Sequence, residues 1–242
     1  MTGQNFNACL DFVRTAEGGY SSDPKDPGNW ITPGKGQPKQ FVGSRYGVSA
    51  PVLAAWLHPQ PVTADMMRTL DVDTFGAIAR SRYWNPLSAS AFPAGIDLML
   101  FDFGWNCGVG SSAILLQRMV GALPDGVIGR RTLDAFDNAA PADILPQISP
   151  ESLTTLHSRL GLPPSSGIGP EVQRAICRRG GLPAVMVLVL SGMQEREYRT
   201  RAGFRRYGRG WLARTRRRTE TALAMVSAEA ARSPDGCVLT PV

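Results

Sequence analysis

The chain has 242 residues, of which 43% are hydrophobic and 19% are charged, as in a folded soluble protein with a sizeable core. The longest apolar run, residues 182–190, is far too short to span a bilayer, which excludes a membrane-spanning helix there. The formal charge is +6, and this excess is local.

Helical spacing of apolar residues dominates the chain. Phe6, Cys9 and Val13 follow this spacing within residues 4–17, and the glycine pair that comes next ends the predicted helix. Residues 21–45 form a long loop rich in Pro, Gly and Lys, and such loops inside compact domains are usually functional. Further helices are expected at residues 49–57, 63–83, 96–103, 111–120 and 182–190. No alternating stretch is long enough to build a sheet, so the predicted fold class is mainly α.

A weak internal repeat joins GVIGRRTLDAF (126–136) and GIGPEVQRAI (167–176). Each copy leads from a glycine turn into a short helix. The pair indicates a small helical subdomain between about residues 110 and 180, although short pieces of this kind also match by chance.

The cysteines argue against a metal site. They stand at positions 9, 107, 177 and 237 without a CxxC pair, and only His58 and His157 could join them as ligands. We therefore expect no zinc site, and buried free thiols rather than disulfides.

Residues 195–218 carry the excess positive charge. They hold ten arginines and two glutamates, a net charge of +8, so the rest of the chain sums to −2. A basic segment of this kind suits an anionic partner or forms a solvated helix face, and both interpretations stay open. Three glycines interrupt it, so we expect no continuous basic helix: Gly203, Gly208 and Gly210. We expect three arginines at its end to point outward: Arg216, Arg217 and Arg218.

Glu17 ends the first predicted helix. It follows Val13 by four residues, so it continues the apolar stripe, and it lies at the helix end where the macrodipole is negative. Partial burial and the dipole both disfavour the carboxylate, and we expect both to raise the pKa of Glu17. A general acid needs such a pKa, although an exposed glutamate without a catalytic role shows the same pattern.

Seven motifs follow one another along the chain. They are EGGY (17–20), DPKDPGNW (23–30), SRYGVS (44–49), Tyr83 with Trp84, DLMLFDFGWNCGVGSSAILLQ (97–117), DGVIGRRTL (125–133) and FRRYGRGWLAR (204–214). Together they resemble glycoside hydrolase family 108, which contains phage-type endolysins and muramidases described as secretion activators. Ser44 and Val48 depart from the family's Thr and Ile. The loop between Trp30 and Ser44 is longer than in the simplest members, and residues 137–182 are expanded.

The resemblance implies a lysozyme-like fold with a small helical C-terminal peptidoglycan-binding-like subdomain. We expect a lysozyme-like catalytic region at residues 1–108, a peptidoglycan-binding-like helical region at residues 109–182, and C-terminal helices at residues 183–232 that pack back on the catalytic region. The implied activity is that of an N-acetylmuramidase, which cleaves the β-1,4 bond between N-acetylmuramic acid and N-acetylglucosamine by general acid catalysis. The alternatives are a lytic transglycosylase and an inactive peptidoglycan-binding protein.

The resemblance assigns Glu17 as the catalytic acid. Asp26 is the candidate second carboxylate, because its spacing from Glu17 is similar to that in phage lysozymes. Asp23 is the runner-up, and its Asp-Pro context also suits a turn. A hydroxyl at Ser44 could hold the attacking water, although Thr32 has the better raw spacing from Asp26.

Aromatic residues supply the candidates for sugar stacking. Tyr20, Trp30 and Tyr46 are the predicted substrate-binding residues, together with Asp23. Trp105 lies in an apolar helix and is expected in the core.

The expected partner is the glycan strand of peptidoglycan, with no nucleic acid, no membrane span, a monomeric chain and no cofactor. The N-terminus lacks the basic and long apolar segments of a secretory signal peptide. We expect the chain to be made in the cytoplasm and to act in the periplasm or cell wall after holin-type or other export.

Overall fold

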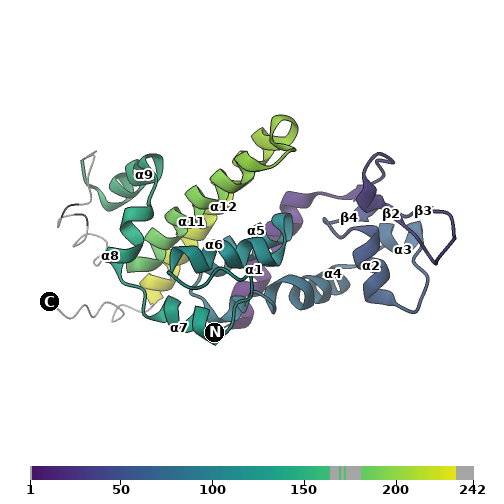
Figure 1. Ribbon diagram of the computed structural model, residues 1–242, viewed down its shortest axis with the longest axis horizontal. Helices are drawn as coiled ribbons and strands as arrows, with labels where there is room; N and C mark the ends of the chain where they lie inside the picture. The colour runs from purple at the N-terminus through teal and green to yellow at the C-terminus, as the bar shows by residue number, and fades with distance from the viewer. Residues whose placement is uncertain (1, 164–168, 170–171, 173–180, 233–242) are drawn as a thin grey trace. The chain divides into compact units, whose positions relative to one another are not determined.

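The computed structural model describes residues 2–163, 169, 172 and 181–232 and is mainly α-helical, as the sequence predicts (Figure 1). Contacts divide the chain into two compact units. One unit comprises Asn7–Tyr83, and the other comprises Met1–Phe6 with Trp84–Val242. The boundary falls inside the first helix, α1, which contributes residues to both units.

The smaller unit contains most of α1, four short strands and three further helices. In chain order its elements are α1 (Thr2–Glu17), β1 (Tyr20–Ser21), η1 (Pro27–Asn29), β2 (Trp30–Ile31), β3 (Gln40–Phe41), β4 (Ser44–Arg45), α2 (Ala50–Leu57), α3 (Ala64–Arg68), α4 (Val72–Ala79) and the π-helical turn η2 (Arg80–Trp84).

The larger unit is a bundle of helices. Its described elements are η3 (Ala89–Ala91), α5 (Ile96–Cys107), α6 (Val109–Met119), α7 (Arg130–Asp137), α8 (Pro141–Ile144), η4 (Leu145–Gln147), α9 (Pro150–Leu160), α11 (Gly181–Thr200) and α12 (Phe204–Arg232). The domain boundaries expected from the sequence stay predictions.

The first helix buries the stripe that its apolar spacing predicts. Phe6, Cys9 and Val13 are all buried along one face of α1. The helix ends at Glu17, and Gly18 then adopts the left-handed region with φ +75°, which turns the chain out of the helix. The predicted stop at the glycine pair is therefore confirmed.

The long loop after α1 folds into two nested hairpins. In the outer pair, β1 is antiparallel to β4, with Tyr20 opposite Arg45 and Ser21 opposite Ser44. In the inner pair, β2 is antiparallel to β3. Asn29 joins the two, because its buried carbonyl accepts hydrogen bonds from the amides of Val42 and Gly43, 2.9 and 3.0 Å away.

Tyr20 closes the outer hairpin. Its hydroxyl donates a 3.0 Å hydrogen bond to the carbonyl of Val42, and its ring lies against Gly43. A Cβ at Gly43 would meet the Tyr20 ring at 2.5 Å, and φ there is +85°. Only glycine fits this position without displacing the ring.

One predicted helix, residues 63–83, is wrong as a single element. The structure divides it into α3 and α4, which are followed by η2. Thr63 caps the first helix as expected, since its hydroxyl accepts from the amide of Met66. Asp71 then caps a new helix, because its carboxylate accepts a 2.7 Å hydrogen bond from the amide of Thr74. The apolar spacing continues across this break and hides it.

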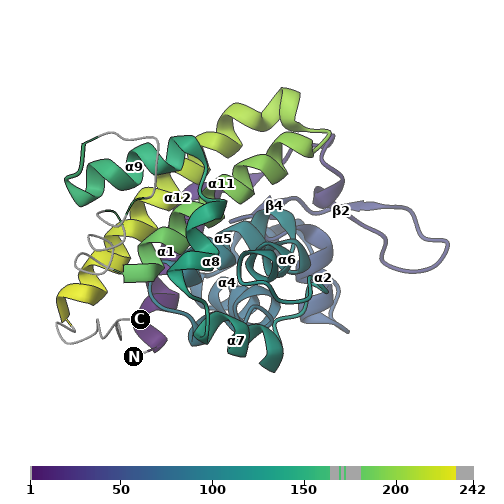
Figure 2. The same ribbon diagram turned by 60° about the vertical axis from the view of Figure 1, so that its left-hand side comes forward.

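A buried ion-pair network holds the larger unit together. Asp102 on α5 accepts hydrogen bonds from the Nε and Nη2 atoms of Arg214 and a 2.6 Å bond from Arg218, and both arginines lie on α12. Arg218 also donates to Gln194 on α11, which in turn donates to the carbonyl of Met99. Burial alone would raise the pKa of Asp102, but the charges of Arg218 and Arg214 outweigh it and hold that pKa below its usual value. Figures 1 and 2 show α11 and α12 lying side by side.

The outward orientation expected for Arg218 is wrong, whereas Arg216 and Arg217 are exposed. The expected breaks in the basic segment are also partly wrong. The chain leaves helix at Gly203, but Gly208 and Gly210 lie inside α12. A Cβ at Gly208 would come within 2.7 Å of the Phe204 ring, so this glycine makes room for an aromatic side chain.

Cys9 is a buried free thiol and Cys107 a partly buried one, while Cys177 and Cys237 lie outside the described residues. Most of the second repeat copy, residues 167–176, also lies outside them. Trp105 is buried, as predicted. Among the described helices, none is both long and apolar enough to cross a membrane.

Replacing Gly43 with alanine should destabilise the protein by about 3 kcal/mol, because it combines left-handed strain with a clash against Tyr20. Gly36→Ala is the matched control, since Gly36 has φ +80° but open space around a Cβ. Gly36→Ala should lower the free energy of unfolding by only about 1 kcal/mol. Urea unfolding followed by circular dichroism measures both, and equal losses would contradict the clash.

Arg218→Met should destabilise by about 3 kcal/mol, because it removes a buried partner of Asp102. Arg216→Met, an exposed neighbour on the same helix, should stay within about 0.5 kcal/mol of the parent. Thermal unfolding of the two variants distinguishes a buried network from a solvated face. Equal melting temperatures would show that Arg218 contributes nothing specific.

Candidate active site

Glu17 is positioned by the end of α1. It is the last residue of that helix and is partly buried, and β1 begins three residues later. Its negative charge acts on the phenol of Tyr83, which lies at the end of the same unit. Burial raises the pKa of the Tyr83 phenol, the charge of Arg82 lowers it, and the charge of Glu17 raises it further. The helix end thus places a carboxylate within electrostatic range of a phenol.

Both candidate aspartates are exposed and take part in the turn that follows β1. The Asp23 carboxylate accepts a 2.9 Å hydrogen bond from the amide of Lys25. Asp26 caps η1, because its carboxylate accepts a 2.8 Å hydrogen bond from the amide of Gly28. Each carboxylate therefore has a turn-forming contact, and each keeps oxygen lone pairs for a ligand. Their catalytic ranking stays a prediction.

The nested hairpins place the two candidate hydroxyls differently. Ser44 lies on β4 directly opposite Ser21, on the strand that pairs with the segment after Glu17. Thr32 follows β2 and is exposed at the wall of a pocket. The strand register thus brings Ser44 across from the segment that leaves Glu17.

Two of the predicted sugar-stacking aromatics make internal contacts. The guanidinium of Arg68 lies 5.1 Å from the Tyr20 ring centroid, and the Tyr20 hydroxyl is bonded to the backbone. Tyr46 has φ +53° in the tight turn between Arg45 and Val48, where it contacts Phe75 at 5.3 Å between ring centroids. Both aromatics therefore shape the hairpin, and their contact with sugar stays a prediction.

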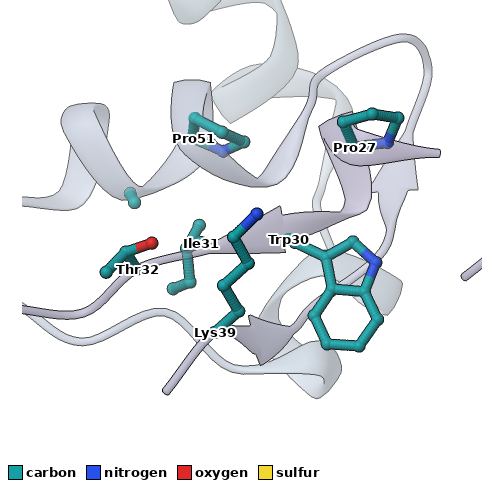
Figure 3. A pocket seen from close by; sticks show the side chains of 7 residues that line it. Pro27, Trp30, Ile31, Thr32, Lys39 and Pro51 are labelled. Carbon is teal, nitrogen blue, oxygen red and sulfur yellow. The ribbon is translucent and has the colours of Figure 1, made fainter. Parts of the chain in front are cut away.

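Trp30 lines an open pocket of about 390 Å³ on the inner hairpin (Figure 3). Its indole donates a 3.0 Å hydrogen bond to the carbonyl of Pro24 and packs edge-on against Phe41. Glu17 does not line this pocket, so the pocket is not the position of the candidate acid. It lies beside the loop of Asp26, since Pro27 is one of its walls.

Two features of the site were not assigned from the sequence. Tyr83 was noted only as part of a Tyr-Trp pair, and its electrostatic coupling to Glu17 depends on a fold that the pair does not encode. Lys39 lies just before β3, and its place in the pocket depends on the β2–β3 register. The sequence signal that could have indicated a role for Lys39 is the lysine content of the loop. Within the described part of the chain, no group of three or more His, Cys, Asp or Glu side chains could hold a metal ion.

Residues 10–108 match the family model Glycosyl hydrolase 108, which is the family that the sequence motifs resemble. The match supports a glycoside hydrolase acting on peptidoglycan. Among solved structures, SagA of Brucella abortus is similar, with a TM-score of 0.63 and 23% identity over 92% of this chain and 96% of that one. This likeness concerns the fold, which is mainly α and lysozyme-like. No curated protein matches the chain.

Asp26→Asn should lower the rate of peptidoglycan solubilisation by about 100-fold, and Asp23→Asn by clearly less. Asparagine keeps the capping hydrogen bond in both turns but removes the negative charge, so the fold should persist. Release of soluble muropeptides measures the rate, and thermal unfolding controls for the fold. A greater loss in the Asp23 variant would reverse the ranking.

Proposed function

We propose that the protein is an N-acetylmuramidase, which hydrolyses the β-1,4 bond between N-acetylmuramic acid and N-acetylglucosamine. The observation that carries the proposal is the position of Glu17. It is a partly buried carboxylate at the end of α1, inside the segment that matches the glycosyl hydrolase family model. The strand that follows, β1, pairs with the strand of Ser44, so that Ser44 lies opposite Ser21.

In this mechanism the Glu17 carboxyl donates its proton to the glycosidic oxygen. The C–O bond to N-acetylmuramic acid then breaks, and the sugar develops oxocarbenium character. The negative charge of Asp26 stabilises that positive charge, with Asp23 as the alternative. The oxygen of a water molecule adds to the anomeric carbon, and the proton that the water loses returns, directly or through solvent, to the Glu17 carboxylate, which is then an acid again.

Ser44 is the proposed holder of the attacking water. Its hydroxyl can donate and accept hydrogen bonds, as the threonine of the resembling family can. Its place opposite Ser21 supports this role over Thr32, because the pairing joins it to the segment after Glu17. The proposed site of action is the periplasm or cell wall, where the substrate lies.

Glu17→Gln should fold like the parent and lose activity by about 10³-fold or more, because glutamine cannot donate a proton to the leaving oxygen. The assay is solubilisation of purified sacculi, with far-UV circular dichroism as the folding control. Glu220→Gln, an exposed change on α12, is the matched variant and should stay fully active.

Mass spectrometry of the parent's products decides the reaction. A muramidase leaves a reducing N-acetylmuramic acid end, whereas a lytic transglycosylase leaves a 1,6-anhydro end without adding water. Anhydro products would show that the protein is a lytic transglycosylase and not a hydrolase. An unchanged rate in folded Glu17→Gln would remove Glu17 from the mechanism.

A further inference from the structure

The pocket on the inner hairpin has an apolar wall and one cation. Its lining residues come from η1, from β2 and the residue after it, from the residue before β3, and from α2, and they include Pro27, Trp30, Ile31, Thr32, Lys39 and Pro51. Figure 3 shows the Lys39 side chain running between Ile31 and the Trp30 ring, with its ammonium group directed toward α2. The volume of about 390 Å³ lies within the range of small-molecule sites.

Among the described residues, no carboxylate pairs with Lys39 where it lines the pocket. Among the described residues that line the pocket, none is acidic, and Lys39 has no ion pair within the described part of the chain. A cation beside aromatic and aliphatic surface suits a ligand that combines a carboxylate with an apolar body.

The basic residues of the chain are unevenly distributed between lysine and arginine. All three lysines, Lys25, Lys35 and Lys39, fall between residues 25 and 39, and every other cationic side chain is arginine. A lysine ammonium is a compact charge on a flexible stem, which suits a carboxylate that arrives in varied geometry. The hairpin therefore differs chemically from the rest of the surface.

The proposed substrate offers such a group at one place. Once the lactyl carboxyl of N-acetylmuramic acid is joined to the peptide stem, the glycan strand is neutral and the free carboxylates belong to the stem. A neutral sugar ring needs stacking surface and neutral hydrogen-bonding groups, and it gives an ammonium group no charge to pair with.

We infer that this pocket binds the peptide stem of peptidoglycan, with the Lys39 ammonium paired to a stem carboxylate and Trp30 packed against the stem. The inference rests on the proposed function, because it identifies the peptide stem as the part of the substrate that is bound beside the candidate active site. Pro27 directly follows Asp26, so a stem held here lies next to the loop that carries the candidate second carboxylate.

The first test compares two substrates for three proteins. The substrates are glycan strands with intact stems and the same strands after an amidase has removed the stems. Lys39→Gln should raise KM for stem-bearing strands by about two- to fivefold and leave kcat unchanged, as expected for one solvent-exposed ion pair. It should leave KM for the stripped strands unchanged. Lys35→Gln is the matched control, because Lys35 lies on the same hairpin outside the pocket lining.

Three outcomes overturn the inference. One is an unchanged KM for stem-bearing strands in Lys39→Gln, and another is an equal change of that KM in Lys35→Gln. An increase on stripped strands, which expose the lactyl carboxylate, would assign Lys39 to the sugar instead of the stem.

The second test needs no catalysis. The stem tetrapeptide L-Ala–γ-D-Glu–meso-diaminopimelyl–D-Ala, with free carboxylates, is titrated into the parent and Lys39→Gln and followed by NMR chemical shifts. Binding should be weaker in the variant, should weaken as salt rises, and should be lost when the peptide carboxylates are amidated. Binding through Lys39 in a protein that cleaves no glycan would keep the pocket and reject the proposed function. Cleavage of glycan strands without Lys39-dependent binding of the tetrapeptide would keep the proposed function and reject the pocket.

Discussion

The contact of Tyr20 with Val42 and Gly43 fixes the geometry on which the candidate active site depends. It ties the segment that leaves Glu17 to the segment that carries Ser44, across 22 positions of sequence. This contact depends on the Tyr20 hydroxyl, which bonds to the Val42 carbonyl, and on the lack of a side chain at Gly43, which leaves room for the Tyr20 ring. Strands of two residues have little stability of their own, so this contact and the carbonyl of Asn29 supply much of what holds the hairpins in register.

The larger unit depends on a different interaction. Asp102 is fully buried, and two arginines surround it while Gln194 completes the network. The charges of a buried pair have to be satisfied completely, since an unpaired partner is costly in a low-dielectric interior. This requirement links α5, α11 and α12 and withdraws Arg214 and Arg218 from the basic surface. The charge available to an anionic partner is therefore smaller than the composition of residues 195–218 indicates.

Local signals in the sequence predicted much of the fold. The stripe of α1, its end at Glu17 and the mainly α class follow from spacing and glycine chemistry within one or two helical turns. The inward turn of Arg218 was missed because its partner lies 116 residues away, and arginine in a basic run otherwise favours solvent. The break between α3 and α4 was missed because apolar spacing continues across it. In the site, Ser44 and Glu17 were named from motifs, but the pairing of β4 with β1 needs long-range contacts that no local pattern encodes.

The two kinds of cation are used for different tasks in this chain. Arginine serves where geometry is fixed, as in the bidentate contact of Arg214 with Asp102, because a planar guanidinium matches a carboxylate held in place. Lysine is confined to the loop that turns toward solvent beside Asp26, where a partner would arrive from outside. An ammonium group on a flexible stem can follow such a partner, whereas a guanidinium gains most from a rigid one. The lysines of this loop therefore lie where the proposed stem carboxylates would arrive, on a part of the surface that carries no arginine between residues 25 and 39.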